Sequence, residues 1–181
     1  MVFTSFHFLA FFFVTITLGH LLKNRTQKLF LLAASYYFYG AFEPWYLLIL
    51  WGSSSWDYLS ALGMRACDRK AEGHKPENIF DRLNFMGRRG WLVLSLVINI
   101  SILAYFKYTN FGIEVVNDLH PLGDTMLSWP TTNILLPIGI SFFTFQSMSY
   151  IIDVYRRVIE PRKSYIDYSM YICFFPHMVA G

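Results

Sequence analysis

The residue of this sequence with the clearest capacity for chemistry is Asp57, the one acid that lies well inside an apolar run. The run covers residues 45–64, and the serines at 53–55 precede the acid by about one helical turn. An Asp near the centre of a membrane-spanning helix costs about 2.5–3.5 kcal/mol to insert, so such acids usually have a function. Two roles remain open for Asp57: a structural hydrogen bond to another helix, and a place on the path of a substrate.

A second set of polar side chains interrupts the apolar run over residues 132–152. Gln146 lies in this run, hydroxyl side chains including Ser141 surround it, and Pro137 and Gly139 precede it. A proline inside a span frees backbone groups that a neighbouring helix or a water-lined cavity must satisfy. The pattern favours a helix that faces a bundle interior or a polar passage, so we expect Gln146, Ser141 and Asp57 to line a substrate path.

Other kinds of reactive site are missing from the sequence. None of the five histidines has a second histidine or a carboxylate at metal-ligand spacing, and two cysteines are too few for a disulfide framework. Neither a nucleophile elbow nor a glycine-rich phosphate loop occurs. We therefore assign no catalytic residue, no cofactor-binding residue and no metal site. Asp153 has a structural explanation, because it precedes Arg157 by four residues, the helical spacing for an ion pair.

The composition indicates a membrane protein. Of 181 residues, 55% are hydrophobic, 19% aromatic and 15% charged, and the mean hydropathy is +0.37. An average soluble domain carries about 25% charged residues. A disordered tail, a collagen-like fibre and almost any soluble domain are therefore excluded. The segment 65–89 mixes seven cations with four anions and has no aromatic spaced for base stacking, so we expect no nucleic acid partner.

Five apolar stretches approach the roughly 20 residues that cross a bilayer. They cover residues 2–22, 29–42, 45–64, 91–106 and 132–152, and a shorter run follows over 165–175. We therefore expect an all-α, polytopic integral membrane protein. It has about five transmembrane helices and a truncated helical segment at its C-terminal end.

The distribution of cations supports five spans and orients them. Lys and Arg accumulate in cytoplasmic loops. The connections of this chain alternate between rich and poor in cations, beginning with a rich one after the first stretch. The alternation predicts an extracytoplasmic N-terminus, a cytoplasmic loop over 65–89 and an extracytoplasmic segment over 107–131, within a single transmembrane domain, 1–181.

Two segments of the chain carry a family signature. The first is Leu-Pro-Ile-Gly-Ile-Ser-Phe-Phe-Thr-Phe-Gln over 136–146, followed by Ser-Tyr-Ile-Ile-Asp-Val-Tyr-Arg over 149–156. The second is Phe-Phe-Pro-His-Met-Val-Ala-Gly over 174–181. Both resemble motifs of the membrane-bound O-acyltransferases. The chain looks most similar to their alginate O-acetyltransferase branch, to which the teichoic-acid D-alanyl transfer protein is related. Earlier pieces also fit, over residues 33–39, 44–48, 57–59 and 105–108.

The resemblance implies a polytopic enzyme whose helices ring a buried tunnel. Such an enzyme passes an acetyl or similar acyl group from a cytoplasmic thioester, such as acetyl-CoA, to hydroxyls of a cell-surface or exported polysaccharide. The implied partners are the lipid bilayer, the acyl donor, and the polysaccharide or a periplasmic acetyltransfer partner protein. The implied location is the bacterial inner membrane, and no bound cofactor is expected.

One feature of the family is missing from this sequence. The family's catalytic histidine belongs to a Trp-His-Gly-like context, and neither a Trp-His nor a His-Gly pair occurs here. The motif over 174–181 normally continues into Pro-Ile. We therefore expect the chain to be an N-terminal portion of the enzyme, inactive on its own.

Two functions of other classes remain open. A multi-helix transporter or channel also places polar residues around a broken helix, although no inverted repeat relates the halves of this chain. A non-catalytic membrane assembly subunit is the third interpretation, and it requires that 181 residues be the complete product.

Overall fold

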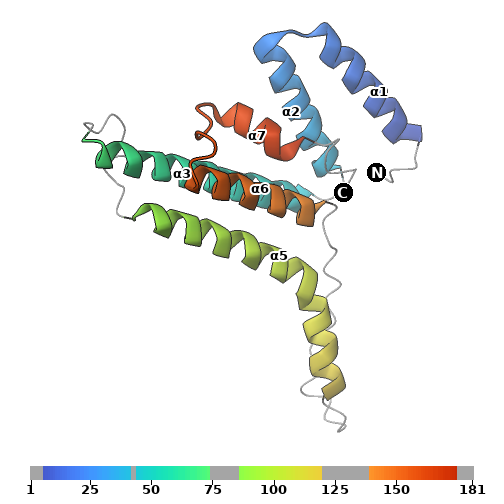
Figure 1. The fold of residues 1–181 in the computed structure, drawn as a ribbon. Helices are drawn as coiled ribbons and strands as arrows, with labels where there is room; N and C mark the ends of the chain where they lie inside the picture. Colours follow the sequence, from blue (N-terminus) through green and yellow to red (C-terminus); the bar gives the residue numbers. More distant parts are fainter. Residues whose placement is uncertain (1–5, 42–43, 74–85, 120–138, 175–181) are drawn as a thin grey trace.

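All elements described by the computed structural model are α-helices (Figure 1). The structure describes residues 6–41, 44–73, 86–119 and 139–174, and no strand occurs in these ranges. The expected all-α fold is confirmed. The helices are α1 (Phe6–Leu21), α2 (Asn24–Gly40), α3 (Pro44–Ala71), α5 (Arg88–Leu119), α6 (Ile140–Tyr155) and α7 (Tyr165–Cys173).

Two helices begin at residues whose backbone suits a helix start. α3 begins at Pro44, whose ring fixes φ near the helical value and whose missing N–H would have no partner in a first turn. α6 begins after Gly139, which has a φ of 75°, a left-handed conformation that glycine adopts without strain. Of the expected apolar span over residues 132–152, the structure describes the part from Gly139 onward. The helix begins at Ile140, and residues 132–138, with Pro137, lie outside the described part of the chain.

Two helices extend beyond the apolar runs that predict them. α3 passes Met64 and includes the charged residues 65–71, and α5 passes Phe106 and ends at Leu119. Figure 1 shows the last part of α5, drawn in yellow, bending away from the other helices. Hydropathy marks where a helix can lie in lipid, whereas residues such as Arg, Lys and Ala continue a helix into water.

One helix of the described residues is long and apolar enough to cross a membrane. Its candidate span is Arg88–Val115, with a mean hydropathy of 1.7 in its most apolar stretch. The apolar stretch of α1, His7–Leu21, is shorter than the roughly 20 residues that a span requires. α6, with 16 residues, and α7, with 9, are also shorter than a span requires. α3 is long enough, but its serines, its acid and the charges at its end lower its hydropathy. The expected five spans are thus not confirmed by length and composition.

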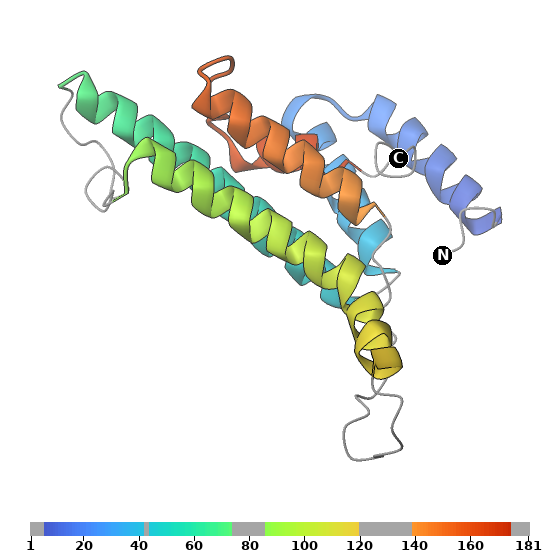
Figure 2. The same ribbon diagram turned by 60° about the horizontal axis from the view of Figure 1, so that its bottom comes forward.

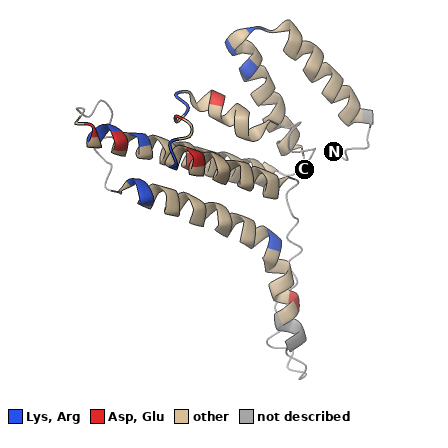
Figure 3. Ribbon diagram, viewed as in Figure 1, with Lys and Arg blue, Asp and Glu red and all other residues tan. Residues whose placement is uncertain are grey.

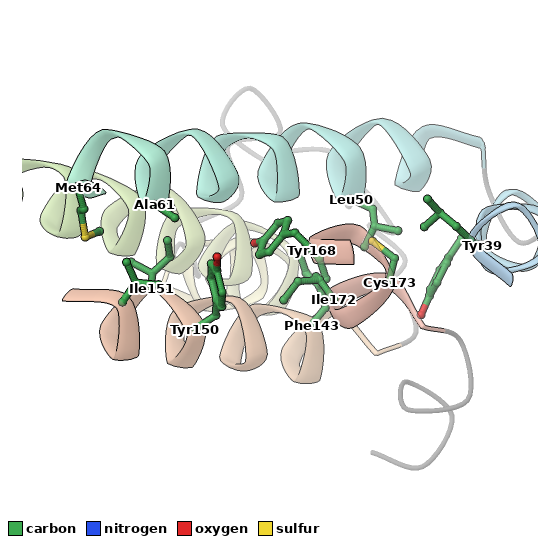
Figure 4. Close-up of a cluster of buried hydrophobic side chains, with 12 residues drawn as sticks. Tyr39, Leu50, Ala61, Met64, Phe143, Tyr150, Ile151, Tyr168, Ile172 and Cys173 are labelled. Atoms are coloured by element: carbon green, nitrogen blue, oxygen red, sulfur yellow. The ribbon is translucent and has the colours of Figure 1, made fainter. Parts of the chain in front are cut away.

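α3, α5 and α6 lie side by side at the centre of the fold (Figures 1 and 2). α7 packs on α2, α3 and α6, and α1 contacts α2. A cluster of buried side chains joins four of these helices (Figure 4). Its members are Leu32, Tyr39, Leu50, Ala61, Met64, Phe143, Tyr150, Ile151, Val154, Tyr168, Ile172 and Cys173. Their burial holds the short α7 against three longer helices.

Most charged side chains of α3, α5 and the segment after α6 gather at one end of the helices (Figure 3). We call this the charged end. It consists of Arg65, Asp68, Arg69, Lys70, Arg88, Arg89, Arg156, Arg157, Arg162 and Lys163. Asp68 pairs here with both Arg88 and Arg157.

Candidate functional site

The carboxyl group of Asp57 is buried where α3 meets α5. Its residue has an exposed fraction of 0%. The Ser95 hydroxyl donates to Oδ1 at 2.5 Å, and the Asn99 amide donates to Oδ1 at 2.9 Å and to Oδ2 at 3.0 Å. Ser95 and Asn99 are themselves buried. Asp57 therefore makes hydrogen bonds to another helix, which is one of the two roles that the sequence left open for it.

Sequence reasoning missed Ser95 and Asn99 because the stretch 91–106 is typical of a plain apolar span. A signal was present, since the two residues are four apart and project from the same face of a helix. Polar side chains on one face of an apolar helix indicate a hydrogen-bonding partner on a neighbouring helix.

Two further hydroxyls lie beside this group. The Ser147 hydroxyl of α6 faces the Asp57 carboxyl, and the Tyr168 hydroxyl of α7 faces Ser147. Both oxygens are buried, and neither has a hydrogen-bond partner of ordinary geometry among the described residues. Four helices thus contribute to what we call the Asp57 cluster: Asp57, Ser95, Asn99, Ser147 and Tyr168.

The serines that precede Asp57 in the sequence have other partners. Ser53 and Ser54 donate to carbonyl oxygens one turn earlier in their own helix, at 2.8 and 3.1 Å. Ser55 shares a hydrogen bond of 2.8 Å with the Tyr165 hydroxyl of α7. Their proximity to Asp57 in the chain therefore did not identify its partners.

Gln146 joins α6 to α7. Its amide nitrogen donates to the backbone oxygen of Tyr171 at 2.8 Å. Because α7 ends at Cys173, the Tyr171 carbonyl lies in the last turn, where carbonyls lack partners within the helix. The Gln146 amide oxygen is buried and has no hydrogen-bond partner among the described residues. The nitrogen of the amide therefore caps the last turn of α7.

The chain is similar to enzymes that acetylate cell-envelope polymers. It is 37% identical over 183 residues to the probable alginate O-acetylase AlgI of Pseudomonas aeruginosa. It is 38% identical over 184 residues to the probable alginate O-acetylase AlgI of Pseudomonas syringae. Each match covers 100% of this chain and 32% of the relative. A peptidoglycan O-acetyltransferase of Helicobacter pylori is 30% identical over 182 residues, 85% of this chain and 30% of that protein. The chain belongs to the membrane-bound O-acyltransferase family.

The chain spans about a third of the length of the curated relatives it matches. No family model matches it, and no solved structure is significantly similar to it. Of the two motifs that carry the resemblance, residues 140–156 form α6 and its C-terminal cap. Phe174 is the only residue of the motif over 174–181 that the structure describes.

The three site residues expected from the sequence lie on two helices and do not meet. Ser141 lies in the first turn of α6 and is partly exposed, Gln146 contacts α7, and Asp57 contacts α5. No hydrogen bond joins any two of them in the described structure. Ser147, the neighbour of Gln146, provides the link from α6 to Asp57. Within the described ranges, no group of three His, Cys, Asp or Glu side chains is placed to hold a metal ion.

At the charged end, Arg88 fastens α5 to α3 and α6. Its guanidinium pairs with Asp68 and donates to the backbone oxygens of Val154 and Tyr155 at 2.7 and 2.6 Å. These carbonyls lie in the last turn of α6, where they have no partner within the helix. The arginine therefore caps α6 from another helix.

The expected ion pair between Asp153 and Arg157 is wrong. α6 ends at Tyr155, and Arg157 has a φ of 61°, so the helical spacing no longer applies. The Arg157 guanidinium instead pairs with Oδ1 of Asp68 on α3 at 2.8 Å.

Proposed function

We propose that this chain forms part of a membrane-bound enzyme that transfers an acetyl or similar acyl group to hydroxyls of an exported or cell-surface polysaccharide. The observation that carries the proposal is the similarity over the whole chain to proteins named alginate O-acetylase. The donor is a cytoplasmic thioester such as acetyl-CoA. The acceptor is the polysaccharide itself or a periplasmic acetyltransfer partner protein.

The other two functions are not favoured. The relatives named above are O-acetylases and an O-acetyltransferase, and none of them is named as a transporter or an assembly subunit. Asp57 and the Gln146 amide oxygen are buried polar groups in an apolar bundle, and with Ser141 they remain our candidates for the path of the acyl group or the acceptor.

A multi-pass arrangement in the bacterial inner membrane is part of the proposal. Large apolar side chains are exposed on α1, α5 and α6, with Phe13 65%, Val97 53% and Phe145 59% exposed. Exposed apolar surface of this extent requires a lipid or protein partner. The clustering of arginines at the charged end agrees with a cytoplasmic position for residues 65–89, and residues 107–131 and the N-terminus then lie outside.

Cysteine labelling tests this orientation. In a chain with Cys67 replaced by serine, single cysteines are introduced at Lys70 and at Glu114, both of which are exposed. A membrane-impermeant maleimide should label Glu114→Cys in intact cells and Lys70→Cys only after the inner membrane is opened. Labelling of both cysteines in intact cells would contradict the orientation. Cys173 is buried and serves as an internal control for unfolding.

Complementation tests the activity. The full-length protein that contains this chain is expressed in Pseudomonas aeruginosa lacking its own alginate O-acetylase, and ester-linked acetyl is measured on alginate and peptidoglycan. We expect the full-length protein to restore acetylation of a polysaccharide, and the 181-residue chain to restore none because it lacks the expected histidine. If the full-length protein reaches the membrane yet restores nothing where the native gene does, the proposed function is wrong.

A further inference from the structure

A pocket of about 400 Å³ lies between α2 and α7, and we call it the α2–α7 pocket. Its lining is charged at one end, the mouth, and apolar along the rest. The mouth consists of Lys28, Arg162 and Asp167, and the apolar lining consists of Leu31, Met170, Tyr171 and Phe174. Asp167 lies in the first turn of α7. At about 1.5 Å per residue, Tyr171 lies about 6 Å further along the helix, so the pocket leads from charged to apolar surroundings.

The mouth carries one positive charge in excess. Nζ of Lys28 pairs with Oδ1 of Asp167 at 2.5 Å, so these two charges offset each other. Figure 3 shows them at the start of α2 and at the start of α7. The exposed Arg162 side chain has no ion pair among the described residues. A guanidinium binds phosphate oxygens through two parallel hydrogen bonds, so Arg162 suits a phosphate group at the mouth.

The backbone that carries Arg162 is fixed by two tyrosines. The Tyr150 hydroxyl of α6 accepts from the backbone N–H of Arg162 at 3.0 Å. The Tyr58 hydroxyl of α3 donates to the backbone oxygen of Lys163 at 3.0 Å. Both bonds leave the Arg162 guanidinium free. A cation whose backbone is already ordered loses less conformational entropy when it binds a ligand.

The lipid site proposed next rests on the membrane arrangement under "Proposed function" and not on acyl transfer itself. Arg162 belongs to the charged end, which that arrangement places on the cytoplasmic side. The mouth then lies at the level of the lipid headgroups, and the apolar lining lies in the hydrocarbon layer. Tyr171 is 42% exposed, so the apolar part of the pocket is open to the outside of the bundle. Lys and Arg at the cytoplasmic surface attract anionic lipids.

We propose that the α2–α7 pocket binds one anionic phospholipid. Its phosphate pairs with Arg162 at the mouth, and one acyl chain lies on Leu31, Met170 and Tyr171. The lipid joins α2 to α7 next to Phe174, the first residue of the family motif over 174–181. A zwitterionic lipid offers the same phosphate and chains but adds a cation, which the excess positive charge of the mouth repels.

Photo-cross-linking in lipid vesicles tests the site without relying on acyl transfer. The full-length protein is reconstituted in phosphatidylcholine with a small share of phosphatidylglycerol that carries a diazirine in one acyl chain. Cross-linked residues are then mapped by mass spectrometry, and they should concentrate at Leu31, Met170 and Tyr171. Unlabelled phosphatidylglycerol should compete for these positions. An equal addition of phosphatidylcholine, or of inorganic phosphate, should not.

Two neighbouring cations provide a variant and its matched control. Arg162→Gln should lower cross-linking in the pocket about fivefold, as expected for the loss of one surface cation that attracts anionic lipid. Its thermal stability should stay near that of the native protein, because the bond to Tyr150 uses the backbone N–H. Lys163 is adjacent, exposed and of the same charge, but it does not line the pocket. Lys163→Gln should therefore leave cross-linking unchanged.

Four results would overturn the lipid site. Equal losses in Arg162→Gln and Lys163→Gln would show a general attraction to surface charge. Competition by inorganic phosphate would indicate a site for a free anion, and equal competition by phosphatidylcholine a site for any lipid. Cross-links on the exposed faces of α1 and α5 with none in the pocket would show that another part of the full-length protein covers it. If the complementation experiment restores no acetylation, the proposed function fails, and the cross-links still decide whether the lipid binds.

Discussion

Gly63→Ala is expected to destabilise the protein strongly for a change of one methyl group. A Cβ atom at residue 63 would lie 2.5 Å from Cε2 of Trp91 and 2.8 Å from both Cδ2 and Nε1 of the same indole. The Trp91 ring belongs to α5, where it packs on the Trp56 ring at 6.3 Å between centroids, so it cannot move aside as the end of a flexible chain would. α3 and α5 must separate instead, and overpacking of this kind costs about 1–3 kcal/mol.

Gly52→Ala on the same helix is the control for this experiment. No atom lies within 4 Å of the Cβ position at Gly52, so alanine fits there, and its helix propensity favours stability by about 0.5–1 kcal/mol. Thermal unfolding of the detergent-solubilised protein should show a lower midpoint for Gly63→Ala and an unchanged or higher midpoint for Gly52→Ala. Combining Gly63→Ala with Trp91→Leu should recover part of the loss, because the smaller side chain removes the clash. Equal midpoints for the two single variants would show that α3 and α5 are not this close.

Arg88→Ala is expected to have a comparably large effect. The change removes the ion pair with Asp68 and the hydrogen bonds to the carbonyls of Val154 and Tyr155, in a place where Arg88 is only 16% exposed. The Val154 carbonyl keeps the backbone N–H of Arg157 as a donor. Hydrogen bonds to charged groups contribute about 1.5–3 kcal/mol each, and some of this returns when water reaches the carbonyls. We expect a loss of about 2–3 kcal/mol, with the end of α6 loosened from α5.

Arg89→Ala is the matched control for Arg88→Ala. Arg89 is adjacent in sequence, has the same charge and is exposed. Its replacement should leave thermal stability within about 0.5 kcal/mol of the native value, as is usual for surface positions. Hydrogen exchange at the C-terminal turn of α6 should rise in Arg88→Ala and stay unchanged in Arg89→Ala. If both variants behave alike, net charge at this end matters and the specific contacts of Arg88 do not.

Local patterns were sufficient to predict the helices. The apolar runs over residues 45–64 and 91–106 correspond to α3 and α5. They could be predicted because apolar periodicity and a helix start at proline depend only on residues close together in the sequence. The family resemblance was likewise carried by contiguous motifs over 136–146 and 174–181. The exact ends were harder to predict, since residues 65–71 and 107–119 continue their helices in charged or mixed sequence.

The amino-acid sequence by itself determined the helical class, the apolar character and the candidacy of Asp57 and Gln146. The tertiary structure alone decided what these side chains contact. Asp57 is bound by Ser95 and Asn99, about forty positions away, and Arg157 pairs with Asp68 on another helix instead of with Asp153 on its own. Such partners depend on how helices pack and where one of them ends. Hydrophobic periodicity records which face of a helix is apolar, whereas a hydrogen bond between helices requires two faces to meet at one depth, and no single segment carries that information.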